Sequence, residues 1–193
     1  MKISKMVKED FSFELLAQDG KARLGKIKSS KGYIDTPVFM PVGTQGTIKG
    51  VFTSDILNTN TQIILGNTYH LLLRPGIEIL KKFGGLHNFM NWNKPILTDS
   101  GGYQIMSLSK FNRIDINLGA IFKSHIDGKK IILSPEKSIK VQKAINSDII
   151  MVLDECPKLT RDKKILSKAI NVSTEWARRS KIEFGSDKSK ALF

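Results

Sequence analysis

The chain has 193 residues and an excess of basic side chains, with 31 Lys and Arg against 18 Asp and Glu, for a formal net charge of +13. Its hydrophobic share of 40% is ordinary for a globular protein, and no apolar run reaches the roughly 18 residues that a membrane span needs. The single cysteine, Cys156, excludes an internal disulfide and a metal site of several thiolates. The charge favours a polyanionic partner such as nucleic acid, although a lysine-rich surface alone would give the same total.

The chain begins with a basic stretch that leads into Glu9 and Asp10 rather than into an apolar signal core, so we expect a cytoplasmic protein. Residues 11–35 mix short apolar patches with glycines and indicate an antiparallel β start. Apolar strands are then predicted at 36–42, 62–65, 95–98 and 148–153, with a β-hairpin over 120–134.

Helices are predicted between these strands. Thr53, Ser54 and Asp55 are predicted to cap a short one, and a longer one follows Asn67, breaks at Pro75 and ends near residue 84. Ser134 and Pro135 open another with a cap residue and a proline at the first helical position. The buried face of the last helix is predicted from its three- and four-residue spacing to carry Ile165, Ala169, Val172 and Trp176.

This alternation predicts an α/β protein with a parallel sheet. Polar residues follow the predicted strands at Gln45, Asn67, Asp99 and Asp154, and in an α/β barrel the carboxyl ends of the strands form the active-site face. Four or five β-α units are about half of a (β/α)8 TIM barrel of ~250 residues. Because residues 190–193 begin a further apolar run, we expect the chain to be the truncated N-terminal portion of such a barrel.

Two stretches carry most of the candidate chemistry. In the stretch 99–104, Asp99 and the paired glycines that follow Ser100 would let a planar ligand approach a carboxylate, and Tyr103 could stack on it. Alternatively, Asp99 only caps the next helix. In the stretch 154–157, Asp154 could accept hydrogen bonds from a guanine-like edge, or could simply cap a loop, and Cys156 could be inert packing.

His70 is a possible general base, although a lone histidine near a helix start is more often structural. Basic residues at 161–164 and 178–181 could contact phosphates, or could form the solvated face of the last helix.

Five collinear stretches resemble the tRNA-guanine transglycosylase family: TPVFMPVGTQGTIKG, ILGNTYHLLLRPG, FMNWNKPILTDSGGYQ, SHIDGKKIILSPEKSI and SDIIMVLDEC. The resemblance extends from about Phe13 to Phe193 and implies a TIM barrel with a zinc-binding insertion. It also implies exchange of the wobble guanine in a tRNA anticodon loop for preQ1, a queuosine precursor, through a covalent enzyme–RNA intermediate. The resemblance further implies a homodimer.

The resemblance also implies site residues in this chain. Asp99 matches the catalytic aspartate that handles the proton of the incoming base, and Asp154 matches the acid that reads the polar edge of the base. The remaining substrate-binding positions are Val42, Leu65, Asn67, Ser100, Gly101, Gly102, Tyr103 and Cys156.

The resemblance also indicates which functional parts of the family's enzyme this chain carries. Val42 and Cys156 suit the preQ1 form better than the queuine form. No nucleophile and no zinc ligand is assigned in this chain, because the family carries both beyond the matched stretches. We therefore expect residues 1–193 to be one part of a single catalytic domain that needs the remaining half for activity. The alternative is a non-catalytic remnant that binds RNA or a base. An unrelated barrel enzyme acting on phosphorylated substrates is disfavoured, because no Gly-rich phosphate loop is present.

Overall fold

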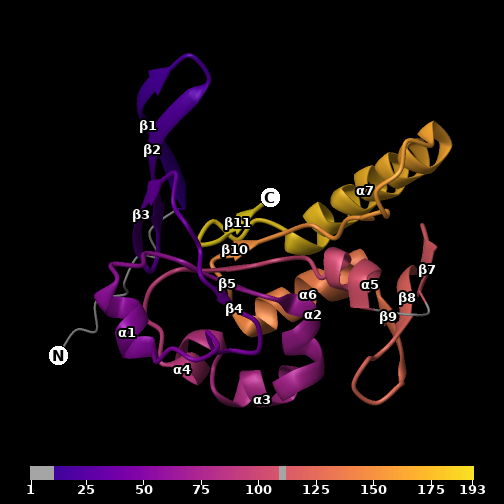
Figure 1. Cartoon of the computed structure of the whole chain (residues 1–193), viewed down its shortest axis with the longest axis horizontal. Helices are drawn as coiled ribbons and strands as arrows, with labels where there is room; N and C mark the ends of the chain where they lie inside the picture. Colours follow the sequence, from indigo (N-terminus) through magenta and orange to yellow (C-terminus); the bar gives the residue numbers. More distant parts are fainter. Residues whose placement is uncertain (1–10, 109–111) are drawn as a thin grey trace.

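The computed structural model describes residues 11–108 and 112–193, which form three sheets and a set of helices (Figure 1). The central sheet is parallel, with strand order β11-β10-β6-β5-β4. Its strands are β4 (Val42–Gly43), β5 (Ile64–Gly66), β6 (Ile96–Thr98), β10 (Ile149–Ile150) and β11 (Ala191–Leu192). The prediction of a mixed α/β fold with a parallel sheet is confirmed.

Two of the parallel strands are much shorter than predicted. The strand expected over 36–42 is reduced to β4, because Pro37 and Pro41 cannot donate ladder hydrogen bonds. The strand expected over 148–153 is reduced to β10, because the side chain of Gln142 binds both backbone polar groups of Met151. A side chain therefore replaces the neighbouring strand at this point.

Helices connect the parallel strands and cover the sheet. The two longest are α6 (Pro135–Ile145), which begins at the predicted Ser134 cap, and α7 (Lys163–Phe184). The others are α1 (Thr53–Asn58), α2 (Thr68–Leu71), the irregular segment η1 (Leu72–Gly76), α3 (Ile77–Lys82), α4 (Leu86–Met90) and α5 (Gly102–Leu108). The break predicted at Pro75 is confirmed, because Arg74 leaves helical geometry inside η1.

Two helix predictions were wrong in detail. Thr53 does not cap α1 with its side chain; its hydroxyl instead donates to the carbonyl of Met90. Ile165 was predicted on the buried face of α7, but its side chain is 47% exposed. The other members of that face, Ala169, Val172 and Trp176, are buried as predicted.

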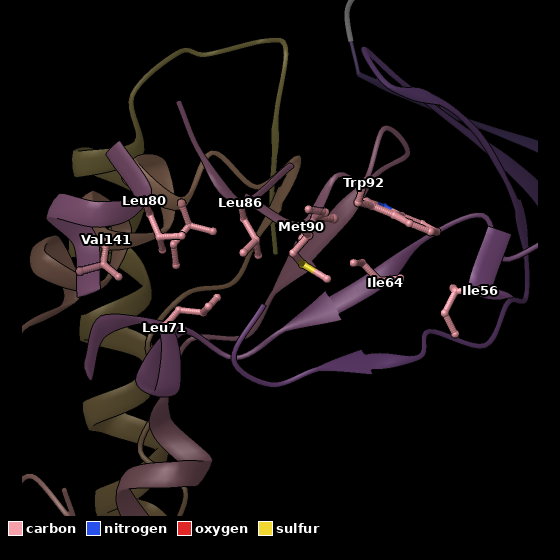
Figure 2. Close-up of a cluster of buried hydrophobic side chains, with 10 residues drawn as sticks. Ile56, Ile64, Leu71, Leu80, Leu86, Met90, Trp92 and Val141 are labelled. Atoms are coloured by element: carbon pink, nitrogen blue, oxygen red, sulfur yellow. The ribbon is translucent and has the colours of Figure 1, made fainter. Parts of the chain in front are cut away.

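The largest apolar cluster lies between the parallel sheet and the helices that cover it, and Figure 2 shows its side chains meeting from strands and helices. Leu80, Leu86 and Ile96 are completely buried in it. Burying a side chain of this size contributes about 1.5–3 kcal/mol. This cluster fixes the strands, and hence the loops that follow them. Its members are Ile56, Ile64, Leu71, Leu80, Leu86, Met90, Trp92, Ile96, Val141 and Ile145.

The other two sheets are antiparallel. The predicted β start is a meander of β1 (Ser12–Asp19), β2 (Ala22–Ser29) and β3 (Gly32–Thr36), which projects from the body in Figure 1. The predicted hairpin corresponds to β8 (Gly119–Lys123) and β9 (Lys130–Leu133), and a strand that was not predicted, β7 (Asn112–Asp115), pairs with β8.

The basic N-terminal stretch lies outside the described residues. Within residues 11–108 and 112–193, no helix has both the length and the apolar character to cross a membrane.

Candidate base-binding site

Loops that follow the parallel strands bring most of the predicted site residues to one edge of the sheet. Asn67 follows β5 and Asp99 follows β6, and these strands are hydrogen-bonded neighbours. Asp154 follows β10, which pairs with the other side of β6. Because all these strands are parallel, their carboxyl ends share this edge, as the sequence predicted.

Asp99 is held in place by three hydrogen bonds. Its Oδ2 accepts from the Asn67 Nδ2 at 2.5 Å and from the Gln104 Nε2 at 2.9 Å, and its Oδ1 accepts from the Thr68 N–H at 2.9 Å. A carboxylate offers about four acceptor positions, and the described residues occupy three of them. Burial raises the pKa of Asp99, and the hydrogen bond from Asn67 opposes that rise. Asp99 does not cap α5; the Ser100 hydroxyl accepts the Gly102 N–H there instead.

Asp154 has the opposite environment. Its side chain is exposed, and its one hydrogen-bond partner in the described part of the chain is the Ser100 hydroxyl, which donates to Oδ1 at 2.9 Å. A Cβ built at Gly102 would lie 2.6 Å from both the carbonyl oxygen and the Oδ1 of Asp154. Glycine is therefore required at 102 by the approach of Asp154, whereas the sequence had suggested the approach of a ligand. The two predicted loops are in direct contact.

A pocket of about 230 Å³ opens beside this contact, and Gly102, Asp154 and Cys156 are among the residues that line it. Its volume is below the roughly 300–1,000 Å³ of sites for drug-sized ligands and suits a fragment the size of one base. Burial raises the pKa of the Cys156 thiol, and the nearby Asp154 adds to the effect. The thiol is therefore protonated at neutral pH and is not an activated nucleophile.

The remaining predicted residues lie around these loops without lining the pocket. Val42 and Leu65 are register partners on β4 and β5, and Val42 is 47% exposed. Tyr103 is the second residue of α5, beside Gly102, and it is 61% exposed, as a stacking surface requires. Gly101 has a φ of +91°, which favours glycine at that position.

Gln142 was not predicted, yet it connects both loops from below. Its Oε1 accepts from the Thr98 hydroxyl and the Met151 N–H, and its Nε2 donates to the Met151 carbonyl and the Ser138 hydroxyl. The Ser138 hydroxyl in turn donates to the carbonyl of Ser100. Gln142 is fully buried. No sequence signal separates it from the solvated glutamines, because its role depends on helix α6 packing under the sheet.

His70 lies beside the Asp99 loop in a cluster of rings. The Tyr69 hydroxyl and the Nδ1 of His125 are 2.9 Å apart, and the ring centroid of His70 is 5.8 Å from that of His125. Burial lowers the pKa of His70, and repulsion from His125 lowers it further. His70 is therefore neutral at pH 7, and its buried Nδ1 has no hydrogen-bond partner among the residues that the structure describes.

Among residues 11–108 and 112–193, no three His, Cys, Asp or Glu side chains converge as metal ligands. These described residues do not fit the zinc ion that the family resemblance implies.

The fold and the two acidic loops define a protein that presents carboxylates at the carboxyl edge of a parallel sheet. A family model described as queuine tRNA-ribosyltransferase matches residues 18–193, and the chain belongs to this family.

Similar bacterial proteins carry the same name. Queuine tRNA-ribosyltransferases from Jannaschia sp. and Cereibacter sphaeroides are 52% and 50% identical to the chain, over 94% and 95% of its length. The protein of that name from Rhizobium meliloti is 49% identical over 96% of the chain. The matches cover 48%, 48% and 49% of these three relatives, so the chain spans about half the length of the curated relatives it matches.

Proposed function

We propose that the chain is the base-binding part of a tRNA-guanine transglycosylase, which exchanges the wobble guanine of a tRNA anticodon loop for preQ1. The observation that carries the proposal is the contact between the Asp99–Gly102 loop and Asp154, in a chain of this family. The proposal includes a TIM barrel completed by residues beyond those described, a homodimer, a cytoplasmic location and a zinc ion held outside this chain. Residues 1–193 would be one part of that single catalytic domain.

The exposed carboxylate of Asp154 is suited to reading a purine edge. Its Oδ1 is oriented by the Ser100 hydroxyl, and Oδ2 is left to accept N–H groups of guanine or preQ1. The ring N–H and the exocyclic amino group of such a base are both hydrogen-bond donors. The Oδ2 of Asp154 therefore selects a base that presents these two donors on one edge. Tyr103 would stack on the same base.

The buried carboxylate of Asp99 is suited to proton transfer. Its raised pKa makes it a better proton acceptor than an exposed aspartate, and its three donors hold it in one orientation. Asp99 would take the proton that the incoming base loses, while Asn67 and Thr68 steady its charge. The nucleophile that attacks the ribose is not assigned to any residue of this chain.

The test has a binding arm and an exchange arm. Calorimetric titration of guanine into the chain should show binding that Asp154→Asn weakens at least tenfold, because an amide replaces one acceptor oxygen with a donor. Asp162→Asn, which alters an exposed helix cap, is the matched control.

In the exchange arm, labelled guanine is followed into unmodified tRNA by the chain alone and by the chain mixed with the second half of a relative. Incorporation only in the mixture, and its loss in Asp99→Ala, is the expected result. Guanine binding without exchange in the mixture would instead identify a non-catalytic base-binding module, and absence of both would contradict the proposal.

A further inference from the structure

A groove of about 820 Å³ lies between α7 and the turn that joins β7 to β8. One wall is the first half of α7, which contributes Lys163, Lys164, Ser167, Lys168 and Asn171. Residues three and four apart share a helix face, so these five polar side chains form one surface. We call this surface the lysine groove. The opposite wall includes Ile114 and Asn117.

The lysine groove carries positive charge that no ion pair among the described residues neutralises, although the Glu155 carboxyl attracts the Lys168 ammonium. Lys163, Lys164 and Lys168 are exposed, and none forms an ion pair with any residue in 11–108 or 112–193. The two arginines of the helix differ, because Arg178 pairs with Glu175 and Arg179 pairs with Glu136.

The acids near the groove are already engaged. Asp115 lines the groove, but its Oδ1 accepts the backbone N–H groups of Asn117 and Leu118, and its Oδ2 pairs with Arg113 at 3.4 Å. Asp162 accepts the Lys164 N–H at the start of α7. The groove therefore combines three lysine ammonium groups with the positive end of a 22-residue helix.

The groove adjoins the candidate base-binding site. It shares Ile114 with the pocket that Asp154 lines, and Lys168 interacts electrostatically with Glu155, the residue next to Asp154. Both features lie where β10 leads through residues 154–162 into α7, at the carboxyl edge of the sheet. A polymer whose base is bound at Asp154 would thus reach the groove with its adjoining backbone.

We propose that the lysine groove binds backbone phosphates of the RNA whose base occupies the Asp154 site, an inference that rests on the proposed function. Lysine ammonium groups contact phosphates as point charges, and the Ser167 hydroxyl and Asn171 amide add neutral donors. Such contacts position the strand and do not read its sequence.

The test measures binding of a fluorescent anticodon stem–loop RNA with guanine at the wobble position, over a range of salt concentrations. The groove variant carries Lys163→Ala, Lys164→Ala and Lys168→Ala. Each single-strand phosphate contact contributes about 0.7 to the slope of log affinity against log salt. We therefore expect the slope to fall by about 2 and affinity at low salt to fall roughly 10- to 100-fold. The control removes equal charge elsewhere, with Lys21→Ala, Lys31→Ala and Lys82→Ala, and should keep most of the affinity.

Three results would overturn the inference: no RNA binding by the parent chain at low salt, an unchanged slope in the groove variant, or equal losses in groove and control variants. Equal losses in the groove and control variants would mean that only the total charge of the chain matters for RNA binding. An unchanged slope would mean that the groove does not contact RNA, and an acidic protein would then be the partner to test. Guanine titration separates this inference from the proposed function. RNA binding that depends on the groove, in a chain without guanine affinity, contradicts the base site and supports the groove. Guanine affinity without dependence on the groove contradicts the groove alone.

Discussion

An aspartate at each edge of the parallel sheet differs from the other in burial and in hydrogen bonding. At the amino edge, Asp148 is 3% exposed, and its Oδ2 accepts from the Nε2 of His87 at 3.0 Å and from the Ile96 N–H at 2.8 Å. At the carboxyl edge, Asp154 is exposed, and among residues 11–108 and 112–193 its side chain has one hydrogen-bond partner, Ser100. Buried acids whose hydrogen bonds are satisfied hold structure, whereas an acid with free acceptor positions can meet a ligand. Asp148 therefore contributes to stability and Asp154 is available for binding, although only a few residues of one strand separate them.

The largest effect is expected at the amino edge. Asp148→Ala leaves His87 and the Ile96 N–H buried without their partner, which should lower the free energy of unfolding by about 3–5 kcal/mol. Urea denaturation measures this loss. Asp154→Ala is the matched change at the other edge and should cost less than about 0.5 kcal/mol, as expected for a surface substitution. Similar losses in the two variants would contradict the division between the edges.

The next effect is expected at Gln142, which joins the interior to the carboxyl edge. Gln142→Leu removes four hydrogen bonds and leaves both backbone polar groups of Met151 buried, so the free energy of unfolding should fall by about 2–4 kcal/mol. Because Gln142 also supports Ser100 through Ser138, guanine affinity should fall as well.

Gln142→Glu provides the control for Gln142, since it keeps the acceptors toward Thr98 and the Met151 N–H and loses the two donors. Urea denaturation and guanine titration of both variants test the prediction. A loss of stability in Gln142→Leu without any change in guanine affinity would show that the support of the loops is not functional.

The sequence predicted much of this sheet and less of what lies beneath it. Period and turn residues located the helix after Ser134 and the apolar cores of the strands, because these depend on local preference and burial. Strand ends were misjudged at two places. At residues 37–41 the prolines lack the N–H group that a ladder hydrogen bond needs. At residues 151–153 the Gln142 side chain takes the place of a neighbouring strand at Met151. Contacts with residues distant in the sequence determine where these strands end, and such contacts leave no signal in the local sequence.

The site was predictable to a similar degree. Motif resemblance selected Asp99 and Asp154 as candidates, but their contrasting burial and the contact between Gly102 and Asp154 depend on three-dimensional packing. The supporting residues Thr68, Gln104 and Gln142 were missed because amides, hydroxyls and backbone N–H groups are common everywhere in a chain.

The third prediction sharpens the comparison at the carboxyl edge. Gly102→Ala would place a methyl group 2.6 Å from the Asp154 carbonyl and Oδ1, so Asp154 must move away from Ser100. Guanine affinity should fall about tenfold, equivalent to roughly 1.4 kcal/mol, while α5 remains folded. Ser107→Ala, an exposed change in the same helix, should leave titration with guanine unchanged. An unaltered affinity in Gly102→Ala would show that the position of Asp154 does not matter for binding.

The smallest effect concerns an acid at the carboxyl edge that is structural. Glu136 begins α6 and pairs with Arg179 of α7 at 2.6 and 2.8 Å, which lowers its pKa from 4.5 to about 2. A lowered carboxyl pKa contributes stability above pH 4.5 that is lost as the pH falls toward 2. Arg179→Ala should therefore cost about 1–2 kcal/mol at pH 7, after allowance for solvent screening, and roughly half of that at pH 3, where Glu136 is still largely ionised in the folded chain.

Urea denaturation at the two pH values tests this effect, and Arg178→Ala, which breaks an exposed pair with Glu175, is the control. A cost of Arg179→Ala that does not change with pH would assign the effect to packing.

The single thiol of Cys156 gives the molecule a built-in reporter. It is half-buried in the wall of the pocket beside Asp154, and its raised pKa makes it react slowly with alkylating agents near neutral pH and faster as the pH rises. With no second cysteine in the sequence, the alkylation rate of the whole chain reports one position. A base seated against Asp154 would shield that thiol, so protection from alkylation measures occupancy directly, without a labelled ligand.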